Sequence, residues 1–519
     1  MTMTRHIRQI VLAGMLALAM APAVRAESLL RTMITTDIRG LMPGNSPDDN
    51  TGTVLQNIYE GLVAWRADGT VAPMLARDIV ISADGRSYTF TLRDGVTFHN
   101  GAALTSREVA WTWQRFLDPN GGWPCRANFD GSRQISILAI ETPDPMHVVF
   151  RLAEPSGAFL STMARADCDS AGVAHPDSVG PDGVWRSAIG TGPFKLVEWR
   201  RGQFVELSRN QAYVAREEPS DGLAGDKTPK VDRIRLAIVP EPAAAKAAMQ
   251  SGDLDLWPSI DPKFASELEA AGIEIVSSPV ASLNAVAMQT SDAVLMDKRI
   301  RQAIDAAIDY ENLAETLTEG FANPSTSLVP SSSRYYGPTE KDGHKYDVLL
   351  ARKLLAEAGY HGQPIMITTN SRFAVMNDTA VLVQAMAQQA GINMSVEVVE
   401  FATQLSRYFK GDYQMMVFNY TPYLDPMFGL DRFIGDKAVQ PDRVWSDPQA
   451  IDLLARLAET SSPEARQPIF DQLHRLFIED SPMLVWSSGA NVAACSRAVR
   501  GYAPWPGRKP RFWNVEVTR

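Results

Sequence analysis

Residues 82–101 read SADGRSYTFTLRDGVTFHNG, and residues 105–116 read TSREVAWTWQRF. In the first run, Tyr88, Phe90 and Leu92 alternate with polar residues, and this period of two is typical of a half-buried strand. Asp-Gly dipeptides on both sides of the strand favour tight turns, because glycine adopts the positive φ angles that such turns require. The second run opens with Thr-Ser-Arg-Glu, the pattern of a capping box, and continues with apolar residues on one helix face. The stretch therefore predicts a hairpin followed by an amphipathic helix.

Three later segments complete the pattern. Residues 190–196 read GTGPFKL, residues 297–304 read DKRIRQAI, and residues 351–360 read ARKLLAEAGY. In this order, together with the first stretch, they resemble the solute-binding proteins of peptide-type ABC importers, the dipeptide and oligopeptide family known as solute-binding protein family 5. The resemblance spans most of the chain. It implies an α/β fold of the two-lobed periplasmic binding protein kind (type II, cluster C-like), with a hinge between the lobes and an extra subdomain inserted in the first lobe.

Strands and helices alternate along the rest of the chain, which indicates sheets covered by helices. Near Ser277 and near Ser487 we expect the chain to cross between the lobes. Two crossings suit a hinge, because each absorbs a dihedral change while the lobes stay rigid. We expect the main part of the first lobe at residues 27–63, 189–277 and 487–519, its inserted subdomain at residues 64–188, and the second lobe at residues 278–486.

The first 26 residues have the composition of a signal peptide. Arg5 and Arg8 form a basic start, residues 10–20 form an apolar run too short to span a bilayer, and small side chains precede the expected cleavage point after Ala26. No cysteine follows the apolar run, so a lipoprotein anchor is not indicated. We therefore expect export to the periplasm of a Gram-negative bacterium.

The charge balance narrows the choice of partners. The chain has 50 Lys and Arg against 60 Asp and Glu, a formal net charge of −10 at pH 7. Nucleic acids and anionic lipids both require a basic face, so neither is expected as a partner. The resemblance implies instead a small-molecule ligand, peptide or peptide-like, and the membrane subunits of an ABC permease. We expect the binding protein itself to be a monomer.

Three cysteines are present in a chain that we expect in an oxidising compartment. Cys125 and Cys168 both lie in turn-rich segments of the expected inserted subdomain, on either side of a predicted hairpin. We expect these two residues to form a disulfide. Cys495 is left over, and we interpret it as a small buried apolar residue.

Motifs for catalysis are missing from the sequence. Residues 222–228 (GLAGDKT) superficially resemble a phosphate-binding loop, but their spacing is wrong and Asp226 stands where glycine must let the backbone approach a phosphate. Neither a Gly-x-Ser-x-Gly elbow nor a His-Glu-x-x-His motif occurs, and the histidines are scattered at no ligand spacing. We therefore expect a binding protein without cofactor or metal rather than an enzyme. An exported hydrolase, the alternative outside this class, requires a nucleophile and a base that the sequence does not show.

The expected ligand contacts of the second lobe lie in residues 418–426, which read FNYTPYLDP and follow a predicted strand. The resemblance implies that the matching loop of the peptide binders holds the ligand's amino terminus with an aspartate three residues before an Asp-Pro pair. Asp425 and the proline after it match that pair, but Pro422 occupies the position of the aspartate. Tyr420 and Tyr423 bring aromatic faces and hydroxyl groups instead, which suit sugars and heterocycles.

This difference changes the expected ligand. A buried ammonium opposite Pro422 lacks a partner, which costs several kcal/mol, so free peptides are expected to bind poorly unless another acid, Asp425 or Glu400, takes over. A non-peptide solute on the same scaffold, such as an opine, a sugar phosphate or an oligosaccharide, is the alternative. The candidate ligand-binding residues of this lobe are Tyr420, Thr421, Tyr423 and Asp425.

A second group of candidates belongs to the first lobe. Residues 119–131 form a loop rich in glycine and proline that carries Trp123. Arg126 and Arg133 have guanidinium groups that can hold a carboxylate or a phosphate in a bidentate manner. We include Trp123, Arg126 and Arg133 among the expected ligand-binding residues, with solvated surface arginines as the alternative.

Overall fold

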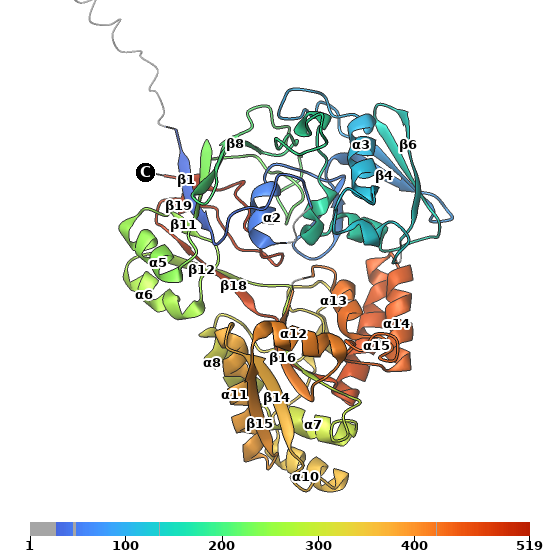
Figure 1. Ribbon diagram of the computed structural model, residues 1–519, viewed down its shortest axis with the longest axis vertical. Helices are drawn as coiled ribbons and strands as arrows, with labels where there is room; N and C mark the ends of the chain where they lie inside the picture. Colours follow the sequence, from blue (N-terminus) through green and yellow to red (C-terminus); the bar gives the residue numbers. More distant parts are fainter. Residues whose placement is uncertain (1–26, 45–47, 134, 422, 519) are drawn as a thin grey trace, which may run out of the picture.

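The structure is a computed structural model that describes residues 27–44, 48–133, 135–421 and 423–518. The expected signal peptide, residues 1–26, lies outside the described residues. Two lobes stand one above the other, and β12 (Glu274–Pro279) and β18 (Ala490–Cys495) run along the first lobe towards the second (Figure 1). This architecture is the two-lobed α/β fold that the sequence predicts. Within the described ranges, the helices lack the combination of length and apolar character needed to cross a membrane.

The main part of the first lobe contains two sheets. Its strands and helices are β1 (Leu29–Ile34), β8 (Phe194–Arg200), β9 (Phe204–Arg209), β10 (Arg233–Ile238), β11 (Leu256–Trp257), α2 (Asp49–Leu55), α5 (Pro242–Ser251) and α6 (Ala265–Ala270), with a short pair of β19 (Val499–Arg500) and β20 (Glu516–Val517) near the C-terminus. One sheet has the order β1-β10-β9-β8, in which only β1 and β10 are parallel. The other has the antiparallel order β11-β18-β12. Helix α2 buries its apolar residues in one core, and α5 and α6 cover a second.

The hairpin and the helix predicted from residues 82–116 both form, and the strand of this stretch, β5 (Ser87–Leu92), belongs to a separate antiparallel sheet of order β4-β5-β7-β6. Glu108 completes the capping box, because its carboxylate accepts a hydrogen bond from the Thr105 backbone N–H at 3.0 Å. The helix then packs Trp113 edge-on against Phe129 and Phe150, with ring centroids 5.1 Å apart in both cases. The elements of this region are β2 (Val63–Trp65), β3 (Val71–Pro73), β4 (Ala76–Ile81), β5 (Ser87–Leu92), α3 (Ser106–Leu117), β6 (Ile137–Asp144), β7 (His147–Leu152) and α4 (Phe159–Met163).

His99 follows this sheet and joins it to the main part of the lobe. Its Nε2–H donates to the carbonyl of Gly192 at 3.0 Å, and its Nδ1 accepts from the N–H of Gly190. Burial, together with the nearby Lys195 ammonium, lowers the pKa of the His99 imidazole to about 4. The unfolded chain, in which the pKa of histidine is near 6.5, therefore takes up this proton first as the pH falls.

We expect this histidine to make the protein less stable between about pH 6.5 and pH 4. The folded pKa is the lower one, so stability is complete above the unfolded pKa, and about 2–3 kcal/mol is lost as the pH falls through that window. Urea unfolding of the wild type and of His99→Gln across this range tests the expectation. The variant should have the shallower pH profile whatever its stability at pH 7, and parallel profiles would contradict the prediction.

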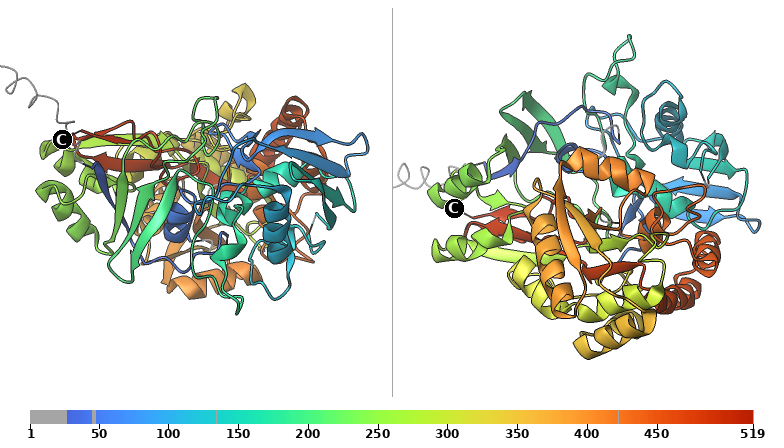
Figure 2. Two further views of the ribbon diagram at one scale, coloured as in Figure 1. Left: turned by 90° about the horizontal axis from the view of Figure 1, so that it is seen from above. Right: turned by 60° about the horizontal axis from the view of Figure 1, so that its bottom comes forward.

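The second lobe contains one five-stranded mixed sheet of order β15-β14-β16-β13-β17. Helices cover both of its faces, as Figure 2 (right) shows, and each face buries its own core. The strands are β13 (Leu283–Met288), β14 (Ile365–Asn370), β15 (Met394–Val399), β16 (Met415–Tyr420) and β17 (Met483–Ser487). The helices are α7 (Lys298–Ala307), α8 (Tyr310–Thr318), α9 (Pro338–Lys341), α10 (Val348–Ala358), α11 (Ala374–Gln389), α12 (Phe401–Lys410), α13 (Pro426–Phe433), α14 (Pro448–Glu459) and α15 (Pro463–Asp480).

The chain passes between the lobes through two short connections. Residues 280–282 lead from β12 to β13, and residues 488–489 lead from β17 back to β18. Because both connections are brief, a change in the angle between the lobes has to be absorbed by the backbone of these few residues. We propose them as the hinge.

The helices α15 and α4 start in different ways. Pro468 does not mark the first turn of α15; that helix begins five residues earlier at Pro463, because Ser462 accepts a hydrogen bond from the backbone of Ala465. Ser156 does not cap the short helix α4, which starts after Ala158 without a side-chain cap.

Candidate functional site

A cleft of about 1140 Å³ lies between the lobes at the carboxyl ends of β14 and β16. These two strands are parallel neighbours, and β15 lies on the opposite side of β14. The chain therefore leaves β14 in one direction along the sheet to reach β15, and it leaves β15 in the other direction to reach β16. Such a switch point leaves a crevice in which ligands of open α/β sheets bind. The first lobe contributes residues 261–263, Ala490, Val492 and Arg508 to the walls, the two connections contribute Val280, Ser282 and Gly489, and the second lobe contributes the rest.

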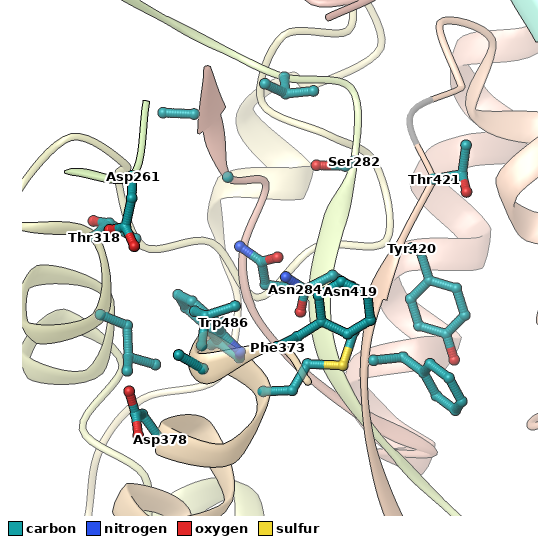
Figure 3. A pocket seen from close by; sticks show the side chains of 18 of the residues that line it. Asp261, Ser282, Asn284, Thr318, Phe373, Asp378, Asn419, Tyr420, Thr421 and Trp486 are labelled. Carbon is teal, nitrogen blue, oxygen red and sulfur yellow. The ribbon is translucent and has the colours of Figure 1, made fainter. Parts of the chain in front are cut away.

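The floor of the cleft carries polar groups from three neighbouring strands (Figure 3). Asn284 of β13 and Asn419 of β16 are opposite one another in the antiparallel ladder, so their side-chain amides lie close together. Trp486 of β17 is 1 % exposed, and its indole Nε1–H has no hydrogen-bond partner among the described residues. A buried donor without a partner is costly. These three groups together offer donors and acceptors for amide or carbonyl groups of a ligand.

Aromatic rings form the walls above this floor. Phe373 at the start of α11 and Phe401 at the start of α12 meet edge to face, with ring centroids 5.0 Å apart. Phe409 of α12 is 57 % exposed. Large apolar side chains that stay exposed beside a cleft are typical of ligand-binding surfaces.

Charged side chains occupy different sides of the cleft. Asp378 of α11 lies on the far side of the Asn284–Asn419 pair from Tyr420 and Thr421 (Figure 3). Asp261 also lines the cleft, but Lys263 pairs with it at 2.5 Å. On the other side, Arg432 of α13 lines the cleft and donates a hydrogen bond to the Tyr423 hydroxyl at 3.3 Å.

Three of the expected ligand-binding residues, Tyr420, Thr421 and Tyr423, line this cleft. Tyr420 ends β16, and its ring packs against Phe433 at 5.6 Å. Burial raises the pKa of the Tyr420 hydroxyl well above its ordinary value, so this group stays protonated. Tyr423 is half-buried, and its backbone N–H donates to the carbonyl of Ala281 in the hinge connection at 2.9 Å. The loop after β16 is therefore tied directly to the hinge.

Asp425 is a structural residue rather than the ligand contact that we expected. It is 2 % exposed and forms a two-point ion pair with Arg466 of α15, at 2.8 and 2.9 Å. Its carboxylate also caps α13 by accepting from the N–H of Met427. Glu400, the other acid considered as a substitute, caps α12. Pro422 lies outside the described residues, so the poor binding of free peptides stays a prediction.

The expected contacts from the first lobe are also placed elsewhere. Trp123 is 3 % exposed and stacks between Phe116 and Phe129, at centroid distances of 4.3 and 5.6 Å, because the surrounding loop folds inward onto α3. Arg126 pairs with Asp130 at 3.1 Å. Arg133 is exposed and donates to Asn128. None of these three expected contacts is among the described residues that line the cleft.

The cleft is also lined by four residues that were not expected from the sequence, namely Asn284, Phe373, Asp378 and Trp486. They come from three elements, β13, α11 and β17, that are far apart along the chain and meet at the edge of the sheet. A signal was available for Trp486 and Phe373, which lie near the ends of β17 and β14, but not for Asn284 at the start of β13 or for Asp378 inside α11. Asn419 lay within the quoted loop but was not selected.

Among the described residues, His, Cys, Asp and Glu do not gather in groups of three that could hold a metal ion. Lys227, from the run that resembles a phosphate loop, is buried rather than at the surface, and its ammonium lies 3.7 Å from the Glu60 carboxylate.

Comparison with known proteins agrees with this geometry. The sequence profile of the bacterial extracellular solute-binding proteins, family 5, matches residues 70–440. The chain is 25 % identical over 481 residues to the probable di/tripeptide-binding protein 5 of Pseudomonas aeruginosa, covering 87 % of this chain and 88 % of that one. It is 26 % identical over 507 residues to heme-binding protein A of Haemophilus influenzae, covering 89 % and 87 %.

The fold has a close counterpart among solved structures. HbpA2 from Haemophilus parasuis superposes with a TM-score of 0.82 at 22 % identity, over 95 % of this chain and all of that one. The chain belongs to family 5 of the bacterial extracellular solute-binding proteins. Members of this family are binding proteins rather than enzymes.

Proposed function

We propose that this protein is the substrate-binding subunit of a peptide-type ABC importer and that it captures a small peptide or peptide-like solute in the cleft between its lobes. The observation that carries the proposal is the position of the cleft. It is lined from both lobes and lies beside both chain crossings, so a ligand in it contacts two bodies that can move relative to each other. The names of family relatives, which include di/tripeptide binding, support the peptide class.

The mechanism that follows is closure on the ligand. A ligand that touches both lobes binds the closed state better than the open state and shifts the population toward it. The closed, ligand-bound form differs in shape from the open, empty form, and this difference lets a membrane permease distinguish the two forms. We place the protein in the periplasm, where such a subunit meets its permease partner.

Native mass spectrometry of freshly purified protein tests the ligand class, because it allows any ligand that co-purifies to be identified. Titration with a mixed dipeptide and tripeptide library is the second measurement. A co-purified or tightly bound peptide supports the proposal.

The second candidate is a non-peptide solute, which the uncharged Pro422 favours. A co-purified opine, sugar phosphate or oligosaccharide, with no binding from the peptide library, would overturn the peptide class and retain the scaffold.

Ligand binding should also make the particle more compact and more stable. Closure about the two connections reduces the radius of gyration, and mass action adds about 2.7 kcal/mol of stability when free ligand is at a hundred times its Kd. Small-angle X-ray scattering and thermal unfolding with and without the identified ligand measure both effects, with a nucleotide as a non-binding control. Stabilisation with unchanged scattering would count against closure.

A further inference from the structure

We propose that a hydrophobic contact beside the cleft acts as a latch between the lobes, with Leu424 and Gly157 as its decisive residues. Leu424 directly follows the cleft-lining Tyr423, so the latch makes Leu424 a positioning residue that holds this ligand contact against the first lobe. The expected effect on ligand affinity rests on the proposed function, whereas the latch itself can be measured without a ligand.

Leu424 belongs to the second lobe by its place in the chain and to the first lobe by its packing. Its side chain is 7 % exposed and is part of the core of the inserted subdomain, with Trp113 and Phe150, rather than of either core beside the second-lobe sheet. The β2–β3 turn lies against it, since a Cβ at Gly69 would be only 2.4 Å from the Leu424 carbonyl oxygen. Separating the lobes on this side would therefore expose an apolar side chain to water, which is unfavourable.

The first lobe places a residue in the second lobe in return. Ala158, just before α4, is 5 % exposed and packs in a core of the second lobe. A Cβ at Gly157 would lie 2.9 Å from the Glu459 carbonyl oxygen and 3.0 Å from the Ser461 nitrogen, and its three nearest neighbours all belong to the second lobe. Gly157 does not have a positive φ, so its own backbone tolerates a side chain. A larger residue at this position therefore opposes only the arrangement in which the lobes touch.

Polar groups join the same two surfaces. The Arg334 N–H of the second lobe donates to the carbonyl of Asp68 in the β2–β3 turn at 3.2 Å. The Arg165 guanidinium of the first lobe lies 5.7 Å from the centre of the Tyr423 ring and 5.0 Å from that of Phe428 in α13. The latch thus involves three separate segments of each lobe, and α13 and α14 lie below the inserted subdomain on this side (Figure 1).

The latch lies outside the cleft but next to its ligand contacts. The described residues of the inserted subdomain do not line the cleft, so a ligand can occupy the cleft while the latch is formed. Tyr420, Thr421 and Tyr423 do line it, and the Tyr423 N–H is also bonded to Ala281 in the hinge connection. A ligand that touches these residues and the first lobe therefore favours the same arrangement of the lobes as the latch does.

Two variants weaken the latch in different ways. Leu424→Ala removes the buried side chain, and Gly157→Val adds one where the second-lobe backbone lies. Leu430→Ala is the matched control for the first, because Leu430 of α13 is 1 % exposed and packs in the second-lobe core. Gly40→Val is the control for the second, because a Cβ at Gly40 has no neighbour within 4 Å. Thermal unfolding of each variant shows that it is folded.

Hydrogen exchange at the Arg334 N–H measures the latch directly. Relative to the amides of β16, this exchange should be slow in the wild type and in both controls. It should be about ten- to a hundredfold faster in Leu424→Ala, the range expected for the burial of one leucine side chain, and Gly157→Val should change it in the same direction. An unprotected Arg334 N–H in the wild type, or latch variants that exchange no faster than their controls, would show that the lobes are not latched here.

Ligand affinity tests the positioning role of Leu424. An identified ligand should bind both latch variants more weakly than the controls, by up to the same factor, because its apparent Kd rises as the binding-competent arrangement becomes rarer. Faster exchange together with unchanged affinity would overturn the positioning role. If no ligand is found, the proposed function fails, and the exchange measurement still decides whether the latch exists.

Discussion

An Asp425→Asn variant is expected to be about 3–5 kcal/mol less stable than the wild type. The change leaves the Arg466 guanidinium buried without its counter-charge, in a site where the two side chains are 9 % and 2 % exposed. Asparagine keeps the shape of the residue and an oxygen that can cap α13, so the loss of the charge is isolated from the loss of the cap. The pair joins α13 to α15, and the effect should therefore fall on the second lobe.

Thermal unfolding measures the effect, which corresponds to about 6–20 °C in Tm for a lobe of this size. Asp452→Asn is the matched control, because this aspartate is exposed on α14 and its loss should change Tm very little. A double variant, Asp425→Asn with Arg466→Met, removes both charges and should recover part of the stability. A Tm for Asp425→Asn equal to that of the control would show that the ion pair contributes nothing.

Much of the fold was predictable because its signals are local. The alternation of Tyr88, Phe90 and Leu92 and the Thr105–Glu108 capping box both act within a few residues, and both occur as predicted. The start of α15 is also set locally. Ser462 caps the helix, Pro463 occupies its first turn, and the helix continues past Pro468.

The site was predicted less well because its residues are brought together by the sheet. Tyr420 and Tyr423 line the cleft, and they were chosen because they follow a strand that the resemblance marks. Asp425 was misassigned because its partner, Arg466, is 41 residues away and no sequence pattern joins them. Trp123 was misassigned because a loop rich in glycine and proline suggests exposure, whereas the rings of α3 bury it.

Removing the disulfide is the second change with a large expected effect. The structure contains the expected bridge between Cys125 and Cys168, which closes a separation of 43 residues. In the chain-entropy account, a loop of this length contributes about 4 kcal/mol. The bridge is followed by Asp169, Ser170 and Ala171, which all have positive φ, at 47°, 53° and 47°. Side chains with a Cβ rarely adopt this region, at a cost of about 1 kcal/mol or more each.

Surrounding contacts must therefore hold this segment in place. The Asp169 carboxylate accepts from the Gly44 N–H at 2.7 Å and lies 3.4 Å from the ammonium of Lys509, which also donates to the Ala166 carbonyl. Without the bridge, these contacts and the hydrogen bonds of Ser170 to the carbonyls of Ala164 and Arg165 are left to oppose the backbone strain. We therefore expect the first lobe to lose at least the stability that chain entropy predicts.

A Cys125→Ala/Cys168→Ala variant tests this expectation by thermal unfolding with and without a reductant. Reductant should lower the Tm of the wild type toward that of the variant and should leave the variant unchanged. Cys495→Ala is the matched control, since Cys495 is buried but unbridged, and its Tm should remain sensitive to reductant. Mass mapping of an unreduced digest should show the peptides of Cys125 and Cys168 linked. Free thiols at both positions in protein purified from an oxidising compartment would contradict the bridge, and the strained segment would then depend on the hydrogen bonds and the ion pair of Asp169 and Ser170.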